Sequence, residues 1–134
     1  MAKLFSKKEI TKVKSQALDP SNMGEPVSAD DYLLRGIAYY ARGNYDAADA
    51  DLCNLISKFG NQIDAYYVLG MVYKAAGRKV EATAAFTQVL QLLSTAAGEK
   101  STRNDMLRRL ALGHVNMINQ GDWNLEKEIW QRIP

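Results

Sequence analysis

The sequence has one cysteine and one histidine in 134 residues. A single cysteine excludes an internal disulfide framework and is compatible with a reducing compartment. The single histidine has no second histidine or cysteine beside it to complete a zinc-type site. No apolar run approaches about 18 residues, so the sequence predicts no transmembrane helix.

An excess of charge of either sign is also missing. The chain has 17 Lys and Arg against 15 Asp and Glu, and its formal net charge of +2 is too small to indicate a nucleic-acid-binding protein by itself. The basic N-terminus is not followed by an uninterrupted apolar stretch, so it does not predict a secretory signal, and the expected location is the cytoplasm. A hydrophobic content of 47% with 24% charged residues predicts a globular chain, and the length favours one domain.

A repeat with a spacing of 34 residues is the strongest pattern present, and it occupies residues 32–93. Such a period is typical of solenoids built from helix-turn-helix units. Five identities and one conservative match fall in one register, namely Tyr32 with Tyr66, Gly36 with Gly70, Tyr39 with Tyr73, Gly43 with Gly77, Ala48 with Ala82, and Leu52 with Phe86.

The spacing within each copy predicts how two helices pack. The first aromatic residue, the glycine and the second aromatic residue lie at i, i+4 and i+7, on one face of a helix. A glycine inside a helix costs roughly 1 kcal/mol relative to alanine, and close approach of a second helix explains why Gly36 and Gly70 are present. Gly43 and Gly77 are expected to end the first helix of each pair.

These residues resemble the tetratricopeptide repeat, in which a large residue, a glycine, an aromatic residue, an alanine and a second large residue occur in this order. The resemblance departs where Gly60 and Asn61 replace the usual proline of the turn between repeats, although Gly-Asn also suits a turn. The resemblance implies an all-α fold, a short right-handed α-solenoid of helix-turn-helix repeats with an N-terminal helical extension.

The chain is expected to divide into two parts. Residues 1–28 form a basic N-terminal helix, from about Lys7 to Leu18, and a linker rich in Pro and Gly. Residues 29–134 form the repeat domain, with repeats at 29–62 and 63–97 and a degenerate third repeat at 103–134. The expected helices of this domain are Ala29–Arg42, Tyr45–Phe59, Ile63–Ala76, Lys79–Ala97, Arg103–Asn119 and Leu125–Ile133.

The register of the third repeat stays open at this point. Gly121 and the two residues after it echo Gly43-Asn44-Tyr45. In that register His114 takes the place of the packing glycine, unless the turn is one residue longer and Gly113 takes it. Trp130 would then fill the place of Leu52 and Phe86.

The polar and reactive residues do not form a recognisable catalytic motif. His114 is expected to be a core or interface imidazole, and Cys53 a buried and inert thiol because Leu52, Leu55 and Ile56 surround it in sequence. The acidic run Asp46, Asp49 and Asp51 is interpreted as a solvated face at the start of a helix. We therefore expect no enzymatic activity, no metal and no cofactor.

The resemblance implies a partner-binding groove on the concave face, lined by the first helix of each pair. The implied contact residues are Leu33, Ile37, Tyr40, Tyr67, Met71 and Lys74, with Asp30 and Asp64 beside them and, in the third repeat, Arg108, Ala111, Val115 and Asn119. Members of the family that grip acidic C-terminal tails have polar groups where this chain has Leu33 and Ile37, so an apolar segment of a partner is favoured here. In an alternative interpretation, the N-terminal helix fills the groove or these residues pack on the neighbouring repeat.

The expected function is that of a protein-protein interaction adaptor. Its size and layout are similar to those of small secretion chaperones, but a subunit of a stable complex fits equally well. A second interpretation is a membrane- or nucleic-acid-associated scaffold that uses the five N-terminal lysines, and its binding would fall steeply with added salt. Arg103, Arg108 and Arg109 with Lys100 are interpreted as a basic end that is solvated and pairs with acidic neighbours, and an anionic partner is the alternative. Trp130 and Ile133 at the other end suggest an interface with a partner or a second copy of the chain.

Overall fold

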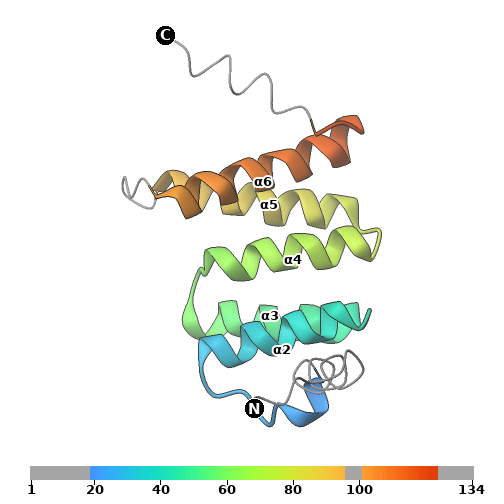
Figure 1. Cartoon of the computed structure of the whole chain (residues 1–134), viewed down its shortest axis with the longest axis vertical. Coiled ribbons are helices and arrows are strands. Elements are labelled where there is room, and N and C mark those ends of the chain that lie inside the picture. Colours follow the sequence, from blue (N-terminus) through green and yellow to red (C-terminus); the bar gives the residue numbers. More distant parts are fainter. Residues whose placement is uncertain (1–18, 96–100, 124–134) are drawn as a thin grey trace, which may run out of the picture.

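The computed structural model describes residues 19–95 and 101–123, and these residues contain α-helices, one short 3-10 helix and no strand. The elements are η1 (Pro20–Asn22), α2 (Ala29–Ala41), α3 (Tyr45–Phe59), α4 (Ile63–Ala75), α5 (Lys79–Thr95) and α6 (Thr102–Gln120). They stack as helical hairpins, α2 against α3 and α4 against α5, with α6 on α5 at the far end (Figure 1). The predicted all-α helical solenoid is confirmed.

The observed helices agree closely with those predicted from the repeat. The first four begin at the predicted residues, and α2 and α4 end one residue earlier than expected. The fifth, α6, extends the predicted helix by one residue at each end. The expected helices at Lys7–Leu18 and Leu125–Ile133 lie outside the described residues.

Local hydrogen bonds explain where the first helices begin and end. Ser28 and Asp31 form a capping box at the start of α2, in which the Asp31 N–H donates to the Ser28 hydroxyl and the Ser28 N–H donates to the Asp31 carboxylate, both at 3.1 Å. Gly43 ends this helix with a left-handed φ of 77°. The Asn44 N–H then reaches back 2.9 Å to the Tyr39 carbonyl, and this closes the turn.

The segment before α2 is more ordered than its composition predicted. The Asp19 carboxylate accepts from the N–H and the hydroxyl of Ser21, at 3.1 and 2.8 Å, and so caps η1. Pro20 is buried, and Asp19 lies 3.8 Å from Arg42 at the end of α2. Residues 19–23 of the predicted linker therefore pack on the first hairpin.

Close approach of paired helices accounts for the two glycines inside them. A Cβ atom on Gly36 would lie 3.0 Å from Leu52 Cγ, and one on Gly70 would lie 2.6 Å from Phe86 Cε1. Leu52 and Phe86 have no exposed surface. Burying a side chain of this size contributes roughly 1.5 to 3 kcal/mol, so each glycine makes room for a large contribution to the core.

A buried ion pair joins α2 to α3, and it overturns part of the interpretation of the acidic run. Arg35 donates to both carboxylate oxygens of Asp51, from Nε at 2.7 Å and from Nη2 at 2.6 Å. Asp51 is only 3% exposed, whereas it was expected on a solvated face. The reason is its position next to Leu52, on the side of α3 that faces α2, where a carboxylate needs a cation to be buried.

Gly113 has the packing role in α6, which resolves one alternative left open by the sequence. A Cβ atom on Gly113 would lie 2.0 Å from Trp123 Cε2, so the indole packs directly against this glycine. The helix runs to Gln120, immediately before Gly121, whereas α2 and α4 end two residues before Gly43 and Gly77. Trp123 follows Gly113 by ten residues, while Leu52 and Phe86 follow their glycines by sixteen, so the third unit closes differently.

Candidate protein-binding surface

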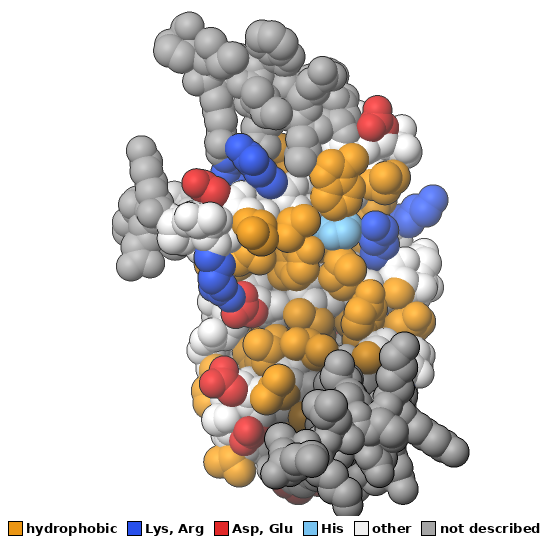
Figure 2. All heavy atoms as spheres, in the orientation of Figure 1, with side chains coloured by type: hydrophobic (Ala, Val, Ile, Leu, Met, Phe, Trp, Pro, Cys, Tyr) orange, Lys and Arg blue, Asp and Glu red, His pale blue; other side chains and the backbone are white. Residues whose placement is uncertain are grey.

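The six predicted contact residues all lie on α2 and α4, and all are half-buried. We call their surface the α2/α4 face; it consists of Leu33, Ile37, Tyr40, Tyr67, Met71 and Lys74. The two helices are in contact with each other, and in Figure 1 α2 lies in front of α3 just as α6 lies in front of α5. Figure 2 shows a band of hydrophobic side chains over this side of the molecule, with charged side chains toward its edges.

Two of the three first-repeat residues of the face are anchored by the core beneath them. Leu33 and Tyr40 pack against the buried cluster that contains Leu52 and Leu55. The Tyr40 ring lies 6.1 Å from the ring of Tyr45 at the start of α3. The half-buried side chains therefore have a supported side and a side left for contact with a partner.

The second-repeat residues of the face also make contacts within the chain. Tyr67 packs edge-on against Phe86 at 5.7 Å between ring centroids, and its hydroxyl lies 3.3 Å from His114 Nε2. Lys74 Nζ lies 3.2 Å from His114 Nδ1. Met71 packs against the same buried cluster as Tyr67 without a polar contact of its own. Tyr67 and Lys74 thus join α4 to α6 as well as lining the face.

Tyr40 on α2 and Tyr67 on α4 lie close enough for Tyr40 to affect the pKa of Tyr67. Burial raises the pKa of the Tyr67 hydroxyl above its usual range, and the nearby Tyr40 hydroxyl adds to this effect. A phenol that resists ionisation keeps the α2/α4 face uncharged at this point.

The sequence model of the tetratricopeptide repeat matches residues 64–92, which are most of α4 and α5. This match falls on the hairpin whose glycine packs against Phe86. Residues 64–92 are therefore similar in sequence to a tetratricopeptide repeat. No curated protein and no solved structure matches the chain. A repeat of this kind suggests a general role in contacts with other proteins.

The third repeat adds less to the face than the resemblance implied. Ala111 has no exposed surface, so it cannot contact a partner, and its expected role was wrong. Arg108 and Val115 are half-buried and Asn119 is exposed. Ala111 is buried because α6 turns this side toward Phe86 and Val89 of the second repeat.

The two flanking aspartates differ in their surroundings. Asp64 accepts from Arg103 Nη2 at 2.6 Å, which links the start of α4 to the start of α6. The acidic pairing expected for this basic end is therefore present at Arg103, across the repeat junction. Asp30 lies exposed in the first turn of α2, where a negative charge is favoured by the helix dipole.

His114 sits at the centre of the junction between the second and third repeats. Its ring stacks on the Phe86 ring with 4.6 Å between centroids and lies edge-on to the Trp123 ring with 4.8 Å between centroids. Only 7% of the residue's surface is exposed. Burial and the positive charge of Lys74 lower the pKa of its imidazole to about 4. Because Lys74 only donates, Nδ1 accepts and Nε2 carries the proton. The expectation of a core or interface imidazole is confirmed.

Cys53 is exposed, so the expectation of a buried thiol was wrong. It follows Leu52 on α3 and turns toward the side where α3 faces α4 and α5. The thiol donates to Asp49 Oδ1 at 3.2 Å. Partial burial and the Asp49 charge raise its pKa to about 11, so the thiol is a weak nucleophile at neutral pH, as expected.

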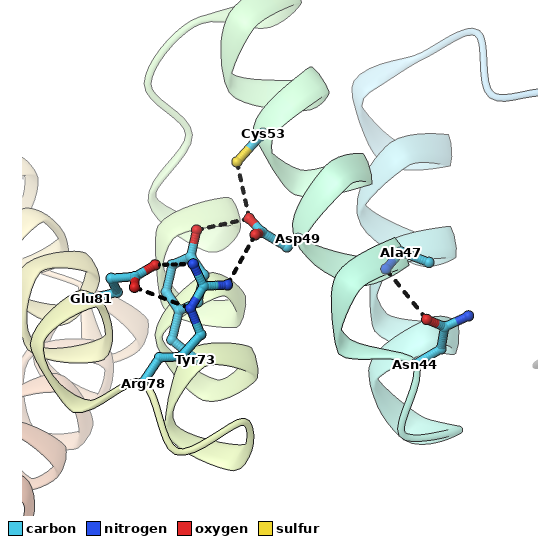
Figure 3. Close-up of polar contacts among 7 residues, drawn as sticks. All are labelled: Asn44, Ala47, Asp49, Cys53, Tyr73, Arg78 and Glu81. Atoms are coloured by element: carbon cyan, nitrogen blue, oxygen red, sulfur yellow. Dashed lines mark hydrogen bonds and ion pairs between the residues drawn. The ribbon is translucent and has the colours of Figure 1, made fainter.

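A polar network around Asp49 joins three helices and was not predicted from the sequence (Figure 3). The Tyr73 hydroxyl donates to Asp49 Oδ1 at 2.7 Å, and Arg78 lies 3.5 Å from Oδ2 of the same carboxylate. Arg78 also pairs with Glu81 and places its guanidinium 4.9 Å from the centre of the Tyr73 ring. Asp49 does not recur in the second repeat, where the equivalent position holds Thr83. This difference between the two copies was the only sequence signal for the network.

Two further classes of site are absent from residues 19–95 and 101–123. No group of three or more His, Cys, Asp or Glu side chains in this part of the chain is arranged to hold a metal ion. None of the helices described combines the length and the apolar character needed to cross a bilayer.

Proposed function

We propose that the protein is an adaptor that holds an apolar segment of a partner protein against the α2/α4 face. The observation that carries the proposal is the set of half-buried apolar side chains at Leu33, Ile37 and Met71 on two adjacent helices, of which Leu33 and Met71 pack on the buried clusters beneath them. Such a surface supplies apolar contact area while its own side chains are already ordered, which lowers the cost of binding.

The sharper form of the proposal is a small chaperone for an exported protein, or an assembly subunit that protects an apolar segment until its complex forms. Met71 supports a surface that accepts more than one apolar side chain, because methionine is flexible and polarizable. We place this activity in the cytoplasm, where the free thiol of Cys53 would stay reduced. We include no enzymatic activity and no cofactor in the proposal.

The contacts of the face residues decide which substitutions test this proposal best. Tyr67→Ala would remove the packing on Phe86 and the contact with His114 in addition to any partner contact. Ile37→Asp and Met71→Asp place a charge on the face without removing a described hydrogen bond. Val80→Asp is a matched control, because Val80 lies on α5 and is 84% exposed.

The test is a pull-down from native lysate with the full chain and these three variants, followed by identification of bound proteins by mass spectrometry. We expect a protein that is captured by the wild type and by Val80→Asp and lost with Ile37→Asp and Met71→Asp. Capture that is unchanged in both face variants would rule out the proposed surface.

Salt dependence separates this proposal from a scaffold that uses the N-terminal lysines, which lie outside the described residues. Apolar binding on the α2/α4 face should change little between low and high salt. Binding that weakens by about tenfold or more over this range would favour an anionic partner instead.

A further inference from the structure

A second groove lies on the other side of α4, between α3 and α5, with a volume of about 670 Å³. This volume is within the range of ligand-binding clefts, which is about 300 to 1,000 Å³. Its floor is formed by Tyr66, Leu69 and Tyr73 of α4, a row that extends over roughly 10 Å of helix. None of the six residues of the α2/α4 face lines it.

The floor of this groove is held in place before anything binds. The Tyr66 hydroxyl donates to the Asn61 side chain at 2.9 Å, and the Tyr73 hydroxyl donates to Asp49 at 2.7 Å. Leu69 between them is 4% exposed and belongs to the core. The two rings therefore have fixed orientations, and a partner would not have to order them.

Short side chains occupy exposed positions in the middle of each wall, while Glu81 and Gln88 line the α5 wall on either side of them. Cys53 and Ser57 line the α3 wall, and Ala84 lines the α5 wall, and all three are exposed. A solvated helix face usually carries long charged side chains at such positions. Short side chains on both walls let another helix approach closely and pack into the space between the two ridges.

The end of the groove nearest the α4–α5 turn is acidic. Asp49 and Glu81 share one guanidinium, that of Arg78, so these three residues have a formal charge of −1 at pH 7 (Figure 3). The side chain of Glu81 is 47% exposed and also lines the groove. This end complements a positive charge on an occupant.

The form of the occupant follows from what the walls offer. The backbone groups of α3 and α5 are used inside these helices, so the walls provide no strand edge to which an extended segment could pair. A helix satisfies its own backbone and presents only side chains. We propose that the α3/α5 groove binds an amphipathic helix of a partner protein, with small apolar side chains on its buried stripe and a Lys or Arg at the Glu81 end.

The probe for this site is a pair of displayed peptide libraries, each of about four helical turns with a randomised apolar stripe. One library has lysines and the other glutamates at one end of the stripe, and both are selected against the full chain. Selected peptides are synthesised with a fluorescent label, and their affinities for variants are measured by fluorescence anisotropy.

The matched variants come from the repeat itself. Ala84→Trp fills the groove from an exposed position, and Ala50→Trp places the same side chain at the equivalent exposed position of the first repeat, which does not line the groove. Ser57→Trp fills the groove from the opposite wall and covers the case in which Ala84→Trp disturbs α5. Ile37→Asp reports on the α2/α4 face.

We expect peptides from the lysine library whose affinity falls at least about tenfold with Ala84→Trp and with Ser57→Trp. Affinity should fall about threefold with Glu81→Gln and stay unchanged with Ala50→Trp and Ile37→Asp. Binders that tolerate both groove-filling variants, or no binder from either library, would overturn the site. Equal binders from the glutamate library would overturn the assigned charge. Loss of binding only with Ile37→Asp would place these peptides on the α2/α4 face and contradict the groove.

Discussion

Arg35 and Asp51 form a buried ion pair in the first repeat, whereas the equivalent positions of the second repeat hold Leu69 and Ala85. The packing glycines and the large residues opposite them are otherwise retained, as Gly36 with Leu52 and Gly70 with Phe86. These two positions of the repeat are therefore charged in the first copy and apolar in the second.

The difference reflects what each first helix packs against. Leu69 is 4% exposed and lies in the cluster that contains Leu52 and Leu55, so it contacts the repeat that precedes it. Arg35 has no preceding repeat among the described residues, and its guanidinium is 3.9 Å from exposed Glu25. A polar residue suits a repeat surface that no described repeat covers, and Arg35 supplies a charged group there while Asp51 neutralises it.

The largest expected effect comes from breaking the ion pair on one side. Arg35→Leu leaves the Asp51 carboxylate buried without a cation, and we expect a loss of about 3 kcal/mol in the free energy of unfolding. Urea denaturation followed by circular dichroism measures it. The double variant Arg35→Leu with Asp51→Ala copies the second repeat and should recover most of the loss.

The double variant is also the critical control. If Arg35→Leu with Asp51→Ala is as unstable as the single variant, the first repeat does not tolerate the apolar arrangement of the second. The comparison of the two positions would then be wrong.

A smaller effect is expected from adding a methyl group at the packing glycines. Gly70→Ala brings a Cβ within 2.6 Å of the Phe86 ring, which is fully buried and cannot move away, so we expect a loss of about 2 kcal/mol. At Gly36 the nearest atom is Leu52 Cγ at 3.0 Å, and the helix propensity of alanine offsets part of the strain. Gly36→Ala should therefore stay within about 1 kcal/mol of the wild type.

Thermal and urea unfolding of the two single variants test this contrast. Phe86→Leu is the informative background, because it gives the second repeat the large residue of the first. Gly70→Ala should cost less in that background than in the wild type. An equal cost would mean that the ring does not cause the strain.

The sequence predicted the parts of the fold that the 34-residue period repeats. The helix starts, the turns at Gly43 and Gly77 and the close contact at Gly70 all follow from residues that recur in register. The burial of Asp51 was missed because a run of aspartates at a helix start reads as solvated. Aligning the two repeats would have revealed this burial, because the first repeat has Arg35 where the second has Leu69 and Asp51 where the second has Ala85. These two positions face each other in the helix pair.

The third repeat and the α3/α5 groove were harder to predict for a different reason. Trp123 follows Gly113 by ten residues, so its packing does not obey the period that revealed the first two repeats. The exposure of Cys53 depends on how far α5 stands from α3, and that spacing is set by tertiary packing. The candidate residues of the α2/α4 face came from the family resemblance, and their role in binding stays a prediction.

The smallest of the three effects tests the difference between the two junctions. Leu69 fills the junction between the first and second repeats, whereas His114 fills the one between the second and third. The imidazole is neutral in the folded protein, with its pKa lowered from 6.5 to about 4, and the groups that face it are Lys74 and Tyr67 of α4. Between these two values the unfolded chain binds a proton that the folded chain does not, so stability falls as the pH drops from about 6.5 to about 4.

The loss across this window is expected to be on the order of 1 to 2 kcal/mol. His114→Gln stays neutral at every pH, so it should be less stable than the wild type at pH 7 and lose less stability on acidification. Urea unfolding at a series of pH values measures both curves, and the carboxylates titrate equally in the two proteins. Parallel curves would show that the imidazole takes up its proton in the folded protein as easily as in the unfolded chain. The junction between the second and third repeats would then be no more sensitive to acid than the junction filled by Leu69.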